Sequence, residues 1–258
     1  MITLENIEYQ VGSRPILDGI DLSVDAGKIV GVMGQSGSGK TTLLRLVVGL
    51  VRPTAGRILI DGVDTTRLSE PDLNRVRRHM GLVFQFSALF DSMTVADNVA
   101  FALREHHLVA PHQVPEAVAQ RLRSVGLEGV DNMMPAELSG GMQKRVGIAR
   151  ALAMEPSIML YDEPTAGLDS VAATSVEDLI VRLRDRLGVT SLVVSHDIVS
   201  LARIADEIAV LESGRIQFRG TPDEVSAATL PVVRKFVAGR LLPARGGPSS
   251  AGVERAEQ

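Results

Sequence analysis

The chain has 258 residues, of which 45% are hydrophobic, and a formal net charge of −4 with a pI near 5.8. This composition is typical of one large globular α/β domain, and the acidic balance argues against nucleic acid as a partner. The lack of cysteine excludes disulfides, thiolate metal sites and cysteine nucleophiles. No apolar run reaches the roughly 20 residues that span a bilayer, and the N-terminus lacks the pattern of a signal peptide. We therefore expect a soluble chain.

The first half of the chain begins with short β-rich segments. The third of them is apolar and runs into a glycine-rich loop, which a helix at about 39–50 follows. The strands predicted in this half are 2–9, 16–24, 28–33, 57–60 and 81–84, with a turn at Asp61-Gly62. From about 86 to 137 the pattern becomes helical, with helices near 94–104 and 115–125.

The second half alternates helices with strands. A helix begins at Ser139, and the later elements are a strand at 158–161, a helix at 170–187, a strand at 190–194 and a hairpin at 208–218. Such alternation predicts a mostly parallel sheet with helices on both faces. Residues 241–258 are rich in Pro, Gly, Ser and Ala and predict a disordered tail.

The strongest motif is GQSGSGKT, which follows an apolar strand and opens a helix. Its glycines let successive backbone N–H groups surround a phosphate, and the helix N-terminus adds a favourable dipole. Lys40 can reach the β- and γ-phosphates, and Thr41 can offer its hydroxyl to Mg²⁺. A glycine-rich connection without a ligand is the alternative for such a loop in isolation. The predicted nucleotide-binding residues here are Gly34, Gln35, Ser36, Gly37, Ser38, Gly39, Lys40, Thr41 and Thr42.

A second motif is the apolar strand at 158–161, which ends in Asp162-Glu163. Carboxylates at the C-terminal end of a parallel strand lie in the crevice where such sheets bind ligands. Asp162 can hold Mg²⁺, and Glu163 is placed to act as a general base on an attacking water. The alternative is that the two acids simply begin a surface loop. The phosphate-binding loop (P-loop) GQSGSGKT in the same chain makes this alternative less favoured than a role in the site.

The third motif is LSGGMQ at 138–143, at the start of a predicted helix. Serine is a good N-cap, and the glycines leave backbone N–H groups open to an anion. A chain with one P-loop has no evident use for a second anion-binding helix start, unless it serves the nucleotide of a second copy. A capped helix without a ligand is the alternative in isolation.

These motifs, with a lone histidine after the strand at 190–194, resemble the motif set of the ABC ATPase family over about residues 2–220. The resemblance implies an α/β fold: a P-loop NTPase (RecA-like) core with a mostly parallel sheet, an N-terminal antiparallel β-subdomain and an inserted helical subdomain. The ATPase domain would cover residues 1–240, with the helical subdomain at about 86–137 and a C-terminal extension at about 221–240.

The resemblance also implies roles for residues that carry little signal alone. Tyr9 is similar to the aromatic residue that stacks on adenine. Gln85 is similar to the glutamine that touches Mg²⁺ and links the core to the helical subdomain, and His196 to the histidine that contacts the γ-phosphate. The implied catalytic residues are Glu163, His196 and Gln85, and the implied metal ligands are Thr41, Gln85 and Asp162. In the signature, the implied nucleotide contacts are Ser139, Gly140, Gly141 and Gln143.

In this family two cassettes face each other head to tail, with each ATP and its Mg²⁺ between the P-loop of one copy and the signature of the other. The resemblance therefore implies a homodimer, held at the cytoplasmic face of the inner membrane by an integral membrane permease. The loop at 166–169 resembles the segment that contacts the opposing copy, and the segment 231–240 is a candidate helix for reinforcing the dimer.

The segment FQFSALFDSMTVADNVAFALREHH at 84–107 resembles the Mla-type (MCE-associated) phospholipid transport ATPases. This resemblance implies phospholipid as the transported substrate, an MCE-domain lipid-binding protein as a partner, and a STAS-type cytosolic protein as a further one. The alternative is the ATPase subunit of an importer for a polar solute such as an amino acid, which would share every ATPase motif. A non-transport ABC protein of DNA repair or translation is less favoured, because the sequence has neither a sustained heptad pattern nor a second cassette.

Overall fold

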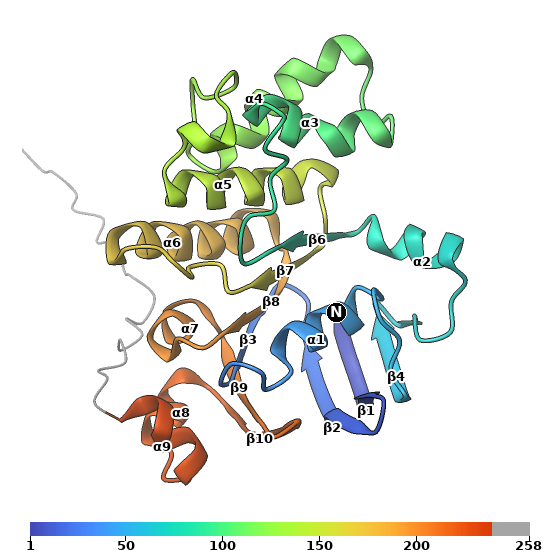
Figure 1. The fold of residues 1–258 in the computed structure, drawn as a ribbon, viewed down its shortest axis with the longest axis vertical. Helices are drawn as coiled ribbons and strands as arrows, with labels where there is room; N and C mark the ends of the chain where they lie inside the picture. Colours follow the sequence, from blue (N-terminus) through green and yellow to red (C-terminus); the bar gives the residue numbers. More distant parts are fainter. Residues whose placement is uncertain (239–258) are drawn as a thin grey trace, which may run out of the picture.

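The computed structural model describes residues 1–238. The tail predicted at 241–258 and the last two residues of the helix predicted at 231–240 lie outside the described residues. Two sheets meet in the lower part of Figure 1, and a layer of helices lies above them. No helix within residues 1–238 is long and apolar enough to cross a membrane.

The smaller sheet is antiparallel and is built mainly from the N-terminal strands. Its strand order is β2-β1-β4-β5. The bounds are β1 (Ile2–Val11), β2 (Arg14–Val24), β4 (Ala55–Ile60) and β5 (Val63–Asp64). Gly12 turns the chain between β1 and β2 with a φ of 60°, a left-handed conformation that glycine adopts without strain. The predicted N-terminal antiparallel β-subdomain is confirmed.

The larger sheet has the strand order β10-β9-β3-β8-β7-β6 and is parallel except for β10. The bounds are β3 (Ile29–Met33), β6 (Met80–Val83), β7 (Ile158–Asp162), β8 (Thr190–Ser195), β9 (Glu207–Glu212) and β10 (Arg215–Gly220). The predicted hairpin is formed by β9 and β10, with Ser213 and Gly214 at φ values of 51° and 76° in its turn. The mostly parallel core is therefore confirmed.

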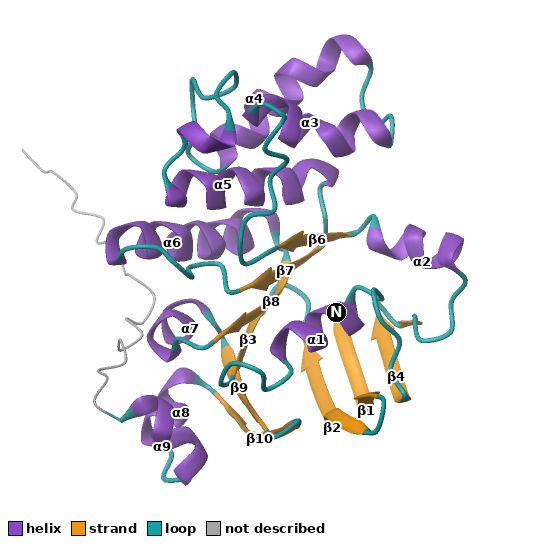
Figure 2. Ribbon diagram, in the orientation of Figure 1, coloured by secondary structure: helices purple, strands orange, loops and turns teal. Residues whose placement is uncertain are grey.

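Figure 2 shows the helices on both faces of this sheet. Their bounds are α1 (Lys40–Val47), α2 (Glu70–Arg77), α3 (Val95–Glu105), α4 (Val114–Ser124), α5 (Gly140–Ala151), α6 (Ser170–Leu187), α7 (Ile198–Ile204), α8 (Pro222–Ala227) and α9 (Pro231–Val237). Three 3₁₀ turns lie at Pro111–Gln113, Pro135–Glu137 and Leu152–Met154. The sequence patterns did not predict α2, α7 or α8, three short helices of eight, seven and six residues.

The central strands β3, β7 and β8 are buried along their whole length. Alternate residues of each strand enter different apolar clusters, because successive side chains point to opposite faces. Val32 and Leu160 pack with α1 and the small sheet, whereas Met159 and Val193 pack with the helices on the other face. The sheet is thus a rigid middle layer, and the loops at its carboxyl ends are held from both sides.

The strand register brings the motif loops to one edge. Met33 pairs with Ser195, and Asp162 pairs with Val194. Val83, the last residue of β6, pairs with Tyr161, which is the residue before the last of β7. The loops that follow β3, β6, β7 and β8 therefore leave the sheet beside one another. These loops carry the P-loop and the residues Gln85, Glu163 and His196.

The side chain of Asn98 ties the start of α3 to the segment that leads into it. Its Oδ1 accepts the N–H of Phe90 at 2.8 Å, and its Nδ2 donates to the carbonyls of Phe90, Met93 and Thr94 at 3.0–3.2 Å. The side chain is fully buried. All of these hydrogen bonds end on main-chain groups that have to be satisfied inside the helical layer.

We expect Asn98→Ala to lower the free energy of unfolding by about 2 kcal/mol, because it leaves buried main-chain groups unpaired. Urea denaturation measures the change. Asn74→Ala, at an exposed position of α2, is the matched control and should change stability by less than about 0.5 kcal/mol. Equal effects of the two substitutions would contradict this role of Asn98.

Candidate active site

The P-loop between β3 and α1 is shaped by glycines that have no room for a side chain. A Cβ on Gly34 would meet the Ser38 hydroxyl and come within 2.6 Å of the Leu211 carbonyl. Gly39 has a φ of 107°, and a Cβ there would lie 2.7 Å from a methyl group of Leu17. The loop is therefore pressed against β2 and the end of β9, and its N–H groups curl at the N-terminus of α1.

Lys40 is buried at the first position of α1, and its ammonium forms hydrogen bonds with main-chain carbonyls of the P-loop. Nζ donates to the carbonyls of Gly34 and Gln35 at 2.8 and 3.1 Å and lies 3.6 Å from Oε1 of Glu163. The hydroxyl of Ser38 is buried in the same loop and has no hydrogen-bond partner among residues 1–238. The P-loop thus holds a buried unpaired hydroxyl and a lysine ammonium, two groups with which a phosphate group can form hydrogen bonds.

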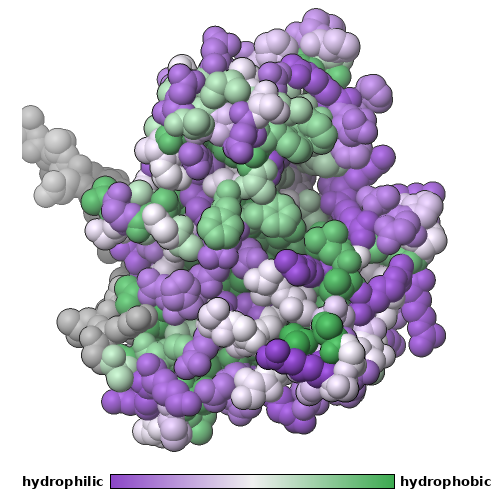
Figure 3. Space-filling view, viewed as in Figure 1, coloured by the Kyte–Doolittle hydropathy of each residue, from purple (hydrophilic) through white to green (hydrophobic). Residues whose placement is uncertain are grey.

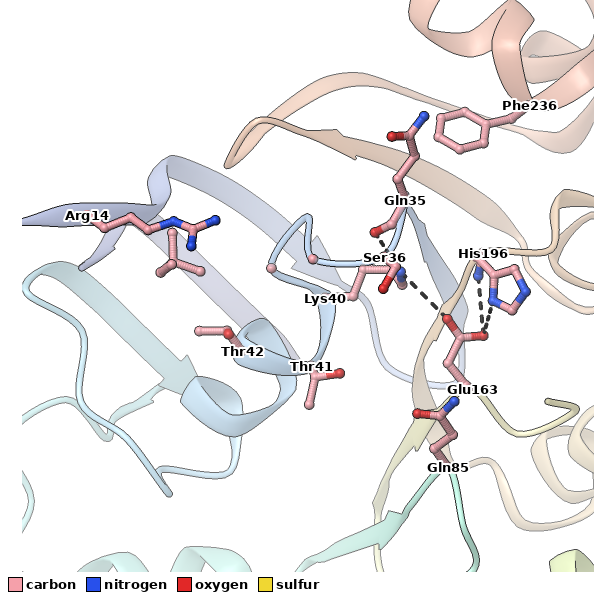
Figure 4. Close-up of a pocket in the computed structure, with 13 residues that line it drawn as sticks. Arg14, Gln35, Ser36, Lys40, Thr41, Thr42, Gln85, Glu163, His196 and Phe236 are labelled. Carbon is pink, nitrogen blue, oxygen red and sulfur yellow. Dashed lines mark hydrogen bonds and ion pairs between the residues drawn. The ribbon is translucent and has the colours of Figure 1, made fainter. Parts of the chain in front are cut away.

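Glu163 follows β7 in a left-handed conformation, with a φ of 48°. Its Oε2 accepts the Ser195 hydroxyl at 3.2 Å and the N–H of His196 at 3.3 Å, and it lies 2.9 Å from Nδ1 of the His196 ring. Its main-chain N–H donates to the carbonyl of Val194. Oε2 is thus held by the end of β8, whereas Oε1 faces Lys40 (Figure 4).

Asp162 and Thr41 bring two oxygen ligands together at the base of the P-loop. The Thr41 hydroxyl donates to Oδ1 of Asp162 at 3.2 Å, and Asp162 is buried. Burial raises the pKa of the Asp162 carboxyl above its usual value; the bond from Thr41 opposes this shift, and the charge of Glu163 adds to it. Hydroxyl and carboxylate oxygens are hard donors that suit Mg²⁺, and a divalent cation would offset the cost of burying this charge.

Lys40, Thr41 and Glu163 line one cavity of about 710 Å³, whereas Asp162 and Ser38 lie outside its lining (Figure 4). Its walls come from the P-loop, from β2, from the loops after β6, β7 and β8, and from α9. The lining residues are Arg14, Ile16, Gln35, Ser36, Gly37, Gly39, Lys40, Thr41, Thr42, Gln85, Glu163, His196 and Phe236. The structure thus brings most of the predicted P-loop residues together with Gln85, Glu163 and His196.

Three lining residues were missed by the sequence analysis. Arg14 and Ile16 lie at the start of β2, and Phe236 reaches the cavity from α9, close to Gln35. Phe236 is half-buried, and Val233 of the same helix is fully buried in the core. No local pattern signals Phe236, because its position depends on how the C-terminal helices fold back over β9.

Tyr9 and the signature residues do not line this cavity. Tyr9 lies opposite Leu17 in the pairing of β1 with β2 and packs against the core cluster on that side. Ser139 caps α5 and accepts the N–H of Met142 at 3.3 Å, whereas Gln143 donates its side-chain amide to the carbonyl of Pro135 at 2.9 Å. A Cβ on Gly140 or Gly141 would lie 3.2 Å from side chains of the segment 168–172, so the signature glycines sit against the loop that begins α6.

We expect Ser195→Ala to lower kcat for ATP hydrolysis about 5-fold with little change in KM, because one hydrogen bond worth about 1 kcal/mol no longer holds Oε2 of Glu163. Steady-state kinetics measures the change. Ser191→Ala is the matched control on the same strand: Ser191 is fully buried and its hydroxyl has no partner in the described part of the chain, so its loss should leave kcat unchanged. A normal kcat in Ser195→Ala would show that this bond does not position the carboxylate.

The chain is similar in sequence to known transport ATPases. The family model described as "ABC transporter" matches residues 17–166. The "Intermembrane phospholipid transport system ATP-binding protein MlaF" of Escherichia coli is 41% identical over 239 residues, which cover 93% of this chain and 89% of the relative. The "Methionine import ATP-binding protein MetN" of Caulobacter vibrioides is 42% identical over 227 residues, which cover 87% of this chain and 68% of that protein.

The fold is similar to that of solved cassettes. A dimeric post-hydrolysis state of the ATP-binding cassette MJ0796, bound to ADP and Pi, superposes with a TM-score of 0.78 at 33% identity, covering 86% of this chain and 99% of the other. With the P-loop, the paired Asp162 and Glu163 and the signature helix in place, these matches show that the chain belongs to the ABC transporter family as an ATP-binding cassette.

Proposed function

We propose that this chain is the ATP-binding and hydrolysing subunit of a bacterial ABC transporter that moves phospholipid through a partner permease. The observation that supports the ATPase function most is the position of the Glu163 carboxylate. It lies in the cavity between the Lys40 ammonium and the end of β8. Phosphoryl transfer requires mostly positioning and charge stabilisation, and this cavity supplies both.

The P-loop would bind the phosphates of ATP, with Lys40 and the Ser38 hydroxyl as charged and polar partners. Thr41 and Asp162 would hold Mg²⁺, and the side chain of Gln85, which lines the same cavity as Thr41, would be a third ligand. The cation would supply charge neutralisation at the transferred phosphoryl group. Among the predicted binding residues, the adenine contact of Tyr9 has the least support, because β2 contributes Arg14 and Ile16 to the cavity instead.

Glu163 is the proposed general base. Its Oε2 already has three contacts, so Oε1 would accept the proton of the attacking water. His196 directs Nδ1 toward Glu163, which leaves Nε2 for the γ-phosphate. With Nδ1–H donated to the carboxylate, Nε2 can donate to phosphate only when the ring is an imidazolium.

A second copy of the chain would complete the site. The signature helix has the capped, glycine-rich start of an anion site, yet Ser139, Gly140 and Gly141 lie outside the cavity of their own chain. We infer a head-to-tail homodimer in which these residues contact the nucleotide bound to the P-loop of the other copy. The loop at 166–169 and α9 would lie near this interface.

Exposed apolar side chains beside Gln85 support docking to a permease. Phe86 is 85% exposed, and Phe84, Phe90 and Phe101 are about two-fifths exposed. Figure 3 shows hydrophobic surface in the middle of the face, below the helical layer. Clusters of this kind mark protein interfaces, so we propose that the permease binds here and holds the chain at the cytoplasmic face of the inner membrane.

Phospholipid is the substrate that the relatives favour, and an MCE-domain lipid-binding protein and a STAS-type cytosolic protein are the further partners that we propose. The similarity to a methionine importer keeps a polar solute such as an amino acid as the second candidate.

We also propose the division into an ATPase domain at 1–240 with a helical subdomain at about 86–137. The helix α5, which follows this subdomain, packs against α3 and α4.

We expect Glu163→Gln to bind ATP, to accumulate as a closed dimer and to hydrolyse ATP at least about 100-fold more slowly, because an amide cannot accept the proton. Single-turnover hydrolysis and size-exclusion chromatography with ATP measure both effects.

Glu177→Gln is the matched control. Glu177 is a buried acid of α6, paired with Arg203 at 3.0 Å, and it does not line the cavity. The control should keep turnover within about 2-fold of the original chain, since it touches no reacting group. Near-normal turnover in Glu163→Gln would remove Glu163 as the base.

The transport function is tested by tagging the chain, extracting it from native membranes in mild detergent and identifying the co-purifying proteins and lipids by mass spectrometry. We expect a permease, an MCE-domain protein and bound phospholipid. A permease with a solute-binding protein would move the substrate to a polar solute, and the absence of any permease would contradict the transport function.

A further inference from the structure

The buried lysine of α5 has a role that neither the P-loop nor the signature explains. Lys144 follows Ser139 by five positions, is 4% exposed, and directs its ammonium away from the signature toward the cavity residues. Nζ donates to the main-chain carbonyl of Gln85 and, at 3.3 Å, to that of Glu163. One ammonium therefore joins two loops that leave different strands of the sheet.

The two loops that Lys144 joins have conformations that need support. Glu163 is left-handed, and so are Ser87 and Ala88, which follow Gln85 with φ values of 59° and 45°. Non-glycine residues in this region cost free energy and persist only where their surroundings hold them. The side chains of Gln85 and Glu163 lie next to each other in the cavity (Figure 4), so the position of their main chains decides the geometry of both.

The same face of α5 contacts the segment after Gln85 at two further positions. A Cβ on Gly147 would lie 3.4 Å from the carbonyl of Ser87, so the helix passes close to that segment. Arg150 donates to the carbonyls of Ala88 and Ser87 at 2.6 and 3.2 Å. Lys144, Gly147 and Arg150 recur every three positions, so they share one side of the helix.

The charged form of Lys144 costs free energy because the side chain is buried. Desolvation lowers the pKa of Lys144, and the nearby charges of Asp162 and Glu163 oppose the shift. An apolar side chain of the same length would fill the space but would leave two buried carbonyls without this donor. The ammonium thus supplies both hydrogen bonds and a positive charge behind the two acids.

We propose that Lys144 is a positioning residue that couples the signature helix to Gln85 and Glu163 of the same copy. When the start of α5 contacts the nucleotide of a second copy, a shift of the helix carries the Lys144 ammonium with it. Both carbonyls follow, so the carboxylate of Glu163 reaches its working position only when the dimer has formed. This coupling rests on the proposed ATPase function and adds a link between the two sites of the dimer.

The lack of cysteine in the chain allows a direct test of the ammonium. In Lys144→Cys, alkylation with 2-bromoethylamine in denaturant, followed by refolding, restores an ammonium on a side chain of nearly the same length. The original chain, taken through the same treatment, controls for refolding. We expect Lys144→Cys and Lys144→Met to lower kcat at least about 10-fold, with KM for ATP and nucleotide affinity within about 3-fold of the original values.

Aminoethylation of Lys144→Cys should recover most of the lost kcat, whereas Lys144→Met, which fills similar space without an ammonium, should keep the low kcat, and a role in packing alone would not give this difference. Arg145→Met is the matched control on α5: Arg145 donates to the Ser175 hydroxyl and not to the cavity loops, so its kcat should stay within about 3-fold. A normal kcat in Lys144→Met, or an aminoethylated chain with a restored melting temperature but no recovery of kcat, would overturn the inference. Absence of hydrolysis by the original chain would instead contradict the proposed ATPase function.

Discussion

The carboxylate of Glu163 is the group on which the rest of the site depends. It is held in a buried place between a cation on one side and hydroxyl, amide and imidazole donors on the other. The cation comes from the P-loop after β3, and the other donors come from the end of β8, so the position of the carboxylate depends on the register of β3, β7 and β8. A slip of one residue in any of these strands would turn their side chains to the opposite face and separate the groups.

Much of this arrangement could be predicted from the sequence because its signals are local. The glycines of the P-loop are required by contacts with Ser38 and Leu211, and the spacing to Lys40 follows from the helix that begins there. The apolar strand before Asp162 and Glu163 is buried on both faces, and continuous apolar runs indicate such strands. The parallel sheet and the hairpin at 208–218 followed from the same kind of pattern, whereas the N-terminal antiparallel sheet was implied by the resemblance to the ABC ATPase family.

Contacts set by tertiary structure could not be predicted in the same way. Phe236 lines the cavity only because α9 folds back on the core, and Lys144 reads in the sequence as an ordinary polar residue after a glycine-rich cap. The helix α2 is short and mostly exposed, with a single buried residue, Leu73, so its apolar periodicity is too weak to detect. Tyr9 differs from the P-loop residues: its place after the first strand implied an adenine contact, and its side chain packs on the core beside β2 without lining the cavity, so this contact stays a prediction.

The signature lies apart from the cavity of its own chain, and we propose on this ground that one chain carries halves of two different sites. The most direct test is a structure of the Glu163→Gln chain with ATP and Mg²⁺. We expect two copies related head to tail, with Ser139 of each within hydrogen-bond distance of the γ-phosphate bound at Lys40 of the other. A nucleotide enclosed by a single copy, with its signature helix far from any phosphate, would contradict the proposed head-to-tail dimer.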